Sequence, residues 1–214
     1  LYYWCSVHSG MGGAINTNAT LGSSNFDGGI QAVVKANPTA GFSMTRWIGT
    51  NGNGTVGHGL GVAPKMVIIR RRPSSSSWVV YHAEVGNTKR LTLDSNAAQS
   101  SASSNWFNNT SPTSTVIYLG SDGGSNGSTD TYIAWCFSEV AGYSKFGSYT
   151  GNGSNDGTFV FTGFRPALVT VKKTNGSANW ETWDSVREPN NEMQRILEWN
   201  DTTTDGASSY TAID

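Results

Sequence analysis

The residues that could carry out acid–base or nucleophilic chemistry are few in this chain. His58 lies in a glycine-rich turn, and His82 ends a short apolar segment. A catalytic triad would need a placed serine and aspartate, but no Gly-x-Ser-x-Gly nucleophile elbow occurs. The glutamates and aspartates show no spacing that singles out the acid and base of a glycan-cleaving enzyme. We therefore expect structural histidines and a protein that is not an enzyme.

One loop is rich in oxygen ligands. Residues 122–130 contain Asp122, Asn126 and Asp130 among glycines, serines and a threonine. Calcium binds carboxylate and amide oxygens, but the loop lacks the alternating acids and the terminal glutamate of an EF-hand. Two interpretations stay open, a solvated loop and a site for calcium or another hard cation. No other cofactor is expected.

Two basic clusters and two tryptophans are candidates for contact with a partner. The clusters could keep a strand edge from pairing wrongly, or they could contact an acidic subunit or an anionic cell-surface glycan. Tryptophans that recur in an internal repeat of the chain are expected to pack in the core. These two lie outside its strictest matches, so they are the better candidates for exposed rings that stack on sugars. These candidates are Arg70, Arg71, Arg72, Lys172 and Lys173, together with Trp106 and Trp199.

The elements that must position these residues occur twice. Pro64 and Pro166 each precede an apolar run that ends in basic residues. Trp78 follows Pro64 at the same separation as Trp180 follows Pro166. The repeat has a period of roughly 100 residues, well above the ~20–50 residues of solenoid repeats. We therefore predict two tandem copies of one domain-sized unit.

Short runs of β-branched and aromatic residues between Gly and Asn turns predict strands in both copies. Residues 51–54 predict a hairpin turn, residues 6–28 a loop, and residues 192–199 a strand in preference to a helix. The alignment of the copies pairs Arg90 with Arg195. The predicted strands cover residues 30–34, 42–48, 66–69, 78–82, 89–93, 106–107, 115–119 and 132–137, and then 145–149, 158–161, 167–172 and 180–184.

This pattern favours an all-β fold of two tandem, homologous antiparallel β-sandwich-like units. The first unit would occupy residues 1–139 and the second, incomplete unit residues 140–214. Residues 1–5 resemble the segment 131–137 that closes the first unit, so the chain would open with the closing strand of an earlier unit. We expect the sequence to be part of a longer protein.

Composition narrows the function classes further. Charged residues make up 14% of the 214 residues, against about 25% in ordinary globular proteins. The net charge of −1 gives no electrostatic footprint for nucleic acid, and no apolar run approaches the ~20 residues of a membrane span. Cys5 and Cys136 each follow a tryptophan and are interpreted as buried small hydrophobic residues, with a disulfide as the alternative.

A set of motifs runs through both copies: YIAWCFSE at 132–139, GSYTGNG at 147–153, GFRP at 163–166, HGLGVAPKM at 58–66 and WVVYH at 78–82. Together they resemble the repeated β domain of tailed-bacteriophage tail and tail-fibre structural proteins, from Trp4 to about Asp214. The resemblance implies a structural, adhesive virion protein outside the cell, with no catalytic residues. Its expected partners are copies of itself, as in a trimer, other virion proteins and a host-surface glycan. Two alternatives stay open, a carbohydrate-binding module and a subunit of a bacterial surface filament.

Overall fold

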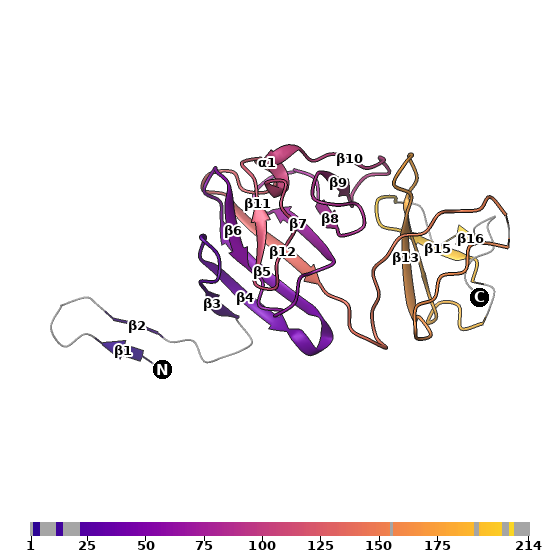
Figure 1. Cartoon of the computed structure of the whole chain (residues 1–214), viewed down its shortest axis with the longest axis horizontal. Helices are drawn as coiled ribbons and strands as arrows, with labels where there is room; N and C mark the ends of the chain where they lie inside the picture. The colour runs from indigo at the N-terminus through magenta and orange to yellow at the C-terminus, as the bar shows by residue number, and fades with distance from the viewer. Residues whose placement is uncertain are drawn as a thin grey trace.

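The computed structural model of the chain describes residues 2–4, 12–14, 22–154, 156–190, 193–202 and 206–207. Nearly all regular structure in these ranges is β-strand, which confirms the all-β prediction. The strands form an eight-stranded sheet, a four-stranded sheet and two sheets of two strands (Figure 1). No helix in the described ranges is long and apolar enough to cross a membrane.

The eight-stranded sheet holds most of the first half of the chain. In spatial order its strands are β10 (Ser100–Ser101), β9 (Lys89–Thr92), β8 (Val79–His82), β7 (Met66–Arg71), β12 (Thr131–Phe137), β5 (Phe42–Ile48), β4 (Ala32–Asn37) and β3 (Ser23–Asn25). The last of these in sequence, β12, lies at the centre and pairs antiparallel with β7 and β5. The motif-bearing strand therefore has its backbone hydrogen bonds satisfied on both edges.

Alternation along β12 separates two faces of this sheet. Tyr132, Ala134 and Cys136 are fully buried, whereas Ile133, Trp135 and Phe137, which alternate with them, are half-buried. Because successive side chains of a strand point to opposite faces, the buried set marks the inner face. That face is covered by a second layer that consists of β6 (Gly54–Gly57), β11 (Val116–Leu119) and the short helix α1 (Ser103–Phe107).

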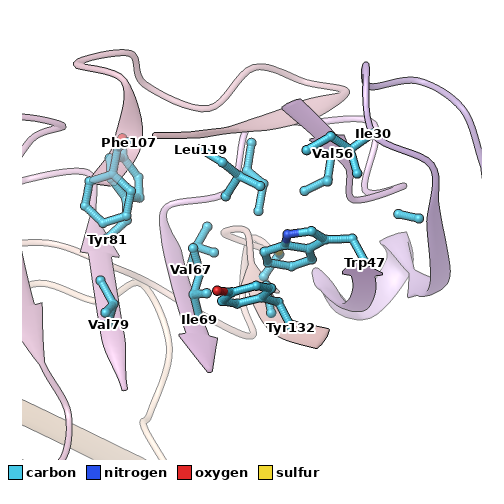
Figure 2. Packing of buried hydrophobic residues seen from close by; sticks show 14 of the residues in the cluster. Ile30, Trp47, Val56, Val67, Ile69, Val79, Tyr81, Phe107, Leu119 and Tyr132 are labelled. Atoms are coloured by element: carbon cyan, nitrogen blue, oxygen red, sulfur yellow. The ribbon is translucent and has the colours of Figure 1, made fainter. Parts of the chain in front are cut away.

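Aromatic rings fill the core between the two layers (Figure 2). The rings of Trp47 and Tyr132 stack with their centroids 5.4 Å apart, and Leu119 of β11 belongs to the same cluster. Tyr81 of β8 meets Phe107 of α1 edge-on, with centroids 5.7 Å apart. Such ring pairs contribute about 0.5–1.5 kcal/mol beyond their buried area. Paired rings thus join the sheet to its covering layer.

Three local predictions for the first half are wrong. Residues 106–107 lie in α1 and not in a strand, because Phe107 packs on Tyr81 from the covering layer. Residues 51–54 do not close a hairpin, since β5 pairs with β4 and β12 whereas β6 pairs with β11. Within residues 6–28, expected to be a loop, β3 extends the large sheet. The same segment contains β2 (Gly12–Ala14), which pairs with β1 (Tyr2–Trp4).

The four-stranded sheet lies beyond β8 and β9 in Figure 1. Its strands, in both sequence and spatial order, are β13 (Leu168–Lys172), β14 (Trp180–Asp184), β15 (Arg195–Glu198) and β16 (Gly206–Ala207). The strand predicted within 192–199 is confirmed as β15, although residues 191 and 192 lie outside the described ranges.

The hydrogen-bond register of this sheet repeats that of β7–β10. Met66 pairs with His82 in the first sheet, and Leu168 pairs with Asp184 in the second. Further along, Val80 pairs with Leu91 and Thr182 with Leu197. The register therefore aligns Leu91 with Leu197, so the sequence alignment of Arg90 with Arg195 is displaced by one residue.

Capping hydrogen bonds recur at the same positions of both sheets. The Trp78 amide donates to Asp94 Oδ1 at 3.0 Å, and the Trp180 amide donates to Asn200 Oδ1 at 2.8 Å. The Trp78 carbonyl accepts from the Leu93 amide, as the Trp180 carbonyl accepts from that of Trp199. The two four-strand meanders therefore share pairing order, register and end caps.

The segments before the two meanders differ. Residues 145–149 and 158–161, predicted as strands, form no strand in the structure, so both predictions are wrong. In the first half, β5 lies between β4 and β12, but the described residues of the second half supply no strand at the equivalent places. A lone extended segment has unsatisfied backbone groups and little burial. Phe159 and Phe161 accordingly remain 86% and 73% exposed.

Candidate functional site

Trp180 joins the two sheets. Its side chain is 5% exposed and belongs to a cluster on the outer face of the large sheet, although Trp180 itself is on β14. Its indole Nε1 donates a hydrogen bond to the Thr92 carbonyl at 2.8 Å. The cluster residues from the large sheet and its edge are Ile68, Val80, Leu91 and Leu93.

Backbone hydrogen bonds strengthen this junction. The Asn96 carbonyl accepts from the Ala178 amide at 2.9 Å and from Lys172 Nζ at 3.1 Å. The Gln99 amide donates to the Thr174 carbonyl at 2.8 Å. Lys172 Nζ also donates to the Ala178 carbonyl at 2.7 Å, and partial burial lowers the pKa of this amine. Lys172, a candidate for contact with another protein, therefore bonds within its own chain.

The rest of the outer face of the large sheet carries a row of rings. Trp78 and Trp135 stack with centroids 5.1 Å apart, and Phe42 meets Phe137 at 5.1 Å. Phe146, from the segment after β12, lies 6.2 Å from Phe137. We call these five residues the outer aromatic face. All except Trp78 lie outside the two repeated meanders, and the register of β12 brings them together.

The three predicted arginines have different surroundings. Arg70 lies over the Trp78 ring at 5.5 Å and donates to the Ser74 carbonyl at 3.1 Å. Arg71 forms an ion pair with Asp130 at 2.7 Å. Arg72 is exposed, as is Lys173 at the end of β13. Since only Arg72 and Lys173 of the five basic residues are exposed, the two basic clusters do not act as free patches of charge.

The oxygen-rich loop is held by protein contacts. Asp122 Oδ1 accepts from the Gly124 amide at 2.7 Å, and Asp130 is paired with Arg71. Asn126 is fully buried, and its amide donates to Thr50 Oγ1 and the Gly52 carbonyl while its Oδ1 accepts from the Thr50 amide. The described residues contain no group of three or more His, Cys, Asp or Glu that could hold a metal. The contacts favour a structural loop over a calcium site.

Tyr132 fixes this loop from below. Its hydroxyl accepts from the Gly127 amide at 2.8 Å and donates to the Gly123 carbonyl at 2.5 Å. Burial raises the pKa of the phenol above its usual value. The ring thus packs in the core while its oxygen satisfies two loop groups.

The two candidate stacking tryptophans differ. Trp106 is half-buried, with the Arg90 guanidinium 4.1 Å from its ring centroid. A Cβ on Gly124 would lie only 2.6 Å from the Trp106 ring, so the ring packs closely on that loop. Trp106 is therefore not the exposed platform expected. Trp199 is 56% exposed, and its Nε1 donates to Thr182 Oγ1 at 2.6 Å, which holds one edge of the indole.

His58 is a structural residue. It is fully buried, Nδ1 accepts from the Leu60 amide at 3.2 Å, and Nε2 lies 3.1 Å from the Thr113 carbonyl. These partners require a neutral ring with the proton on Nε2, and burial lowers its pKa. Cys136 is a free, fully buried cysteine, as interpreted from the sequence, and burial raises the pKa of its thiol to about 12. Cys5 lies outside the described residues.

One pair of acids is not predicted by the sequence. Glu181 on β14 is directly opposite Glu198 on β15. Burial, and secondly the charge of Glu198, raise the pKa of Glu181. The two glutamates are opposite each other because of the register between β14 and β15. The spacing of residues in the sequence does not reveal that register. Neither the hollow lined by Ile69 and Phe107 nor the one lined by Arg187 and Arg195 includes Glu181 or Glu198 in its lining.

The apolar hollow behind β7 has a volume of about 10 Å³, which holds at most about one water. Its lining includes Ile69, Tyr81 and Phe107. This hollow is a packing gap and not a ligand site.

Comparisons with known proteins place the chain in a family without giving it an activity. No curated protein and no solved structure matches it. The matching family model covers residues 15–214, and with them both meanders. The chain therefore belongs to the family described as a domain of unknown function, DUF7483.

Proposed function

We propose that this chain is a structural and adhesive segment of a bacteriophage virion fibre or tail appendage, exposed outside the cell. The observation that carries the proposal is the repeated register of β7–β10 and β13–β16. Fibres are built from repeated units that pack on one another. The buried Trp180 packs one proposed unit against the other. The units we propose are residues 1–139 and 140–214, homologous and sandwich-like.

Exposed apolar side chains support an assembly role. Phe159, Val160 and Phe161 follow one another in the chain and are 86%, 48% and 73% exposed. Contiguous exposed apolar surface commonly marks contact with another protein. We therefore propose that the chain assembles with itself, as in a trimer, and with other virion proteins.

Two measurements test this proposal. Light scattering on the purified chain should show a homo-oligomer, and gold-labelled antibodies should decorate the tail or fibres of the virion that encodes it. A stable monomer together with unlabelled particles would refute a fibre role. Label on bacterial surface filaments would instead favour the filament subunit.

A second candidate, a carbohydrate-binding module, is favoured by Trp199. An indole that is 56% exposed and held by a hydrogen bond to Thr182 offers a fixed stacking surface. A glycan array should then show a signal that Trp199→Ala removes and Trp106→Ala preserves. No signal above background, or equal loss in both variants, would eliminate sugar stacking at Trp199.

A further inference from the structure

The outer edge of β13 has no strand beside it in the described residues. In the four-stranded sheet β13 is the terminal strand, whereas its counterpart β7 pairs with β12 along six positions. Apart from the pairing of β13 with β14, no backbone hydrogen bond within the described ranges involves residues 168–172. An open row of amides and carbonyls is a template for another strand.

Side chains on β13 are more exposed than their counterparts on β7. Val67 and Ile69 on β7 are each 1% exposed, but the register-matched Val169 and Val171 are only half-buried. Leu168 is 59% exposed. β13 thus exposes apolar side chains at positions where the matching side chains of β7 are covered by β12 and the second layer.

The first repeat shows which kind of strand fits this edge. Next to β7, β12 places Trp135 opposite Ile68 and Cys136 opposite Val67. The chain contains a second Trp-Cys pair at residues 4 and 5, immediately at the end of β1. In the described residues β1 pairs with β2 along one edge, and no strand is described beside its other edge.

We propose that β1 of a second copy of this chain adds antiparallel to β13, in the place that β12 takes beside β7. The register follows from the first repeat. Trp4 of the second copy would lie opposite Thr170, and Cys5 opposite Val169. Main-chain hydrogen bonds would supply the affinity, as in other strand additions.

This contact is head-to-tail, because the donor strand lies near the N-terminus and the acceptor edge in the second repeat. Each copy would donate to one neighbour and accept from another, and such heterologous contacts produce rings or open filaments. Strand addition does not depend on the protein being viral, so failure of this contact would leave the fibre proposal standing.

Oxidative cross-linking tests the predicted register in the full chain. In Val169→Cys, copper(II)–phenanthroline as oxidant should join the introduced thiol of one copy to the Cys5 thiol of another in a disulfide. Non-reducing gels should then show a ladder of dimers and larger species that dithiothreitol removes. Cys136 should not contribute, since it is fully buried with a pKa of about 12.

Two matched variants control for random collision. Thr170→Cys shifts the thiol by one residue to the other face of β13, and Cys5→Ser combined with Val169→Cys removes the donor thiol. Both should reduce the ladder at least tenfold. Equal ladders in Val169→Cys and Thr170→Cys, or none in either, would overturn the proposal.

A binding measurement on the unmodified chain covers the case in which Val169→Cys misfolds. A fluorescein-labelled peptide of residues 1–7 should bind saturably, and hydrogen exchange should slow at the amides of β13. A peptide of scrambled order should do neither. Peptide binding without protection of β13, or no saturable binding, would overturn the proposal.

Discussion

Trp180→Ala is expected to release the second sheet from the first. The wild-type indole is 5% exposed, lies in the cluster with Ile68 and Val80, and bonds the Thr92 carbonyl. Truncation of a buried tryptophan to alanine costs about 3–5 kcal/mol, a figure that includes the lost hydrogen bond of about 1 kcal/mol. Three further hydrogen bonds at the junction, at Asn96 and Gln99, are too weak to compensate.

Urea unfolding followed by circular dichroism would measure the total loss of stability. Hydrogen exchange resolved by mass spectrometry would show which strands lose stability. The amides of β13–β15 should exchange faster, while those of β12 and β5, which pair along seven positions, should change little. Trp199→Ala is the matched control, because its exposed ring should cost less than about 1 kcal/mol.

Two results would refute this role of Trp180. The first is a loss of stability in Trp180→Ala no larger than that in Trp199→Ala. The second is an equal rise of exchange in both sheets, since that would mean that the two sheets unfold as one unit and Trp180 is not a separable junction.

Three smaller predictions concern buried polar groups. Tyr132→Phe should cost about 1–3 kcal/mol, because the Gly127 amide loses its partner; thermal unfolding would measure this, and a wild-type Tm would contradict it. His58 has a lowered pKa in the folded state, so its stability contribution is complete above about pH 6.5 and is lost as the pH falls through the folded pKa. The urea midpoint of the wild type should therefore drop between about pH 7.5 and 5.5, and His58→Gln should drop less. Glu181 has a raised folded pKa, so its contribution is present below about pH 4.5 and lost as the pH rises. Glu181→Gln should then stabilise the chain at pH 7 by up to about 1 kcal/mol, and an unchanged midpoint would show that neither burial nor the charge of Glu198 destabilises the Glu181 carboxylate.

The buried strands could be predicted from the sequence because short runs of β-branched residues favour strands. Val67, Ile69 and Val79 lie in short β-branched runs and are all at most 1% exposed. The covering layer was harder to predict. Trp106 and Phe107 are typical of a strand by composition, but their helical turn is fixed by Tyr81 and Gly124, which are distant in sequence.

The candidate site residues were the least predictable part. Residue type places Arg71 and Asp130 in separate candidate sites, yet they form one ion pair at the ends of the neighbouring central strands β7 and β12. The same reasoning makes Lys172 a candidate for an external partner, yet it bonds to Asn96 in the first half of the chain. Each outcome depends on pairing between elements far apart in sequence, which residue type and spacing do not encode.

The paired motifs at residues 40–43 and 141–144 show how far local sequence decides structure. Gly41 and Gly142 both adopt a left-handed conformation, with φ of 64° and 73°, which glycine tolerates and other residues rarely adopt. The left-handed glycine is therefore a local feature that both motifs share. The strand β5, which follows Gly41, lies between β4 and β12, whereas residues 145–149, which follow Gly142, form no strand. Because β-propensity depends on neighbours, residues 145–149 should form a strand only when a strand of the β12 kind lies beside them.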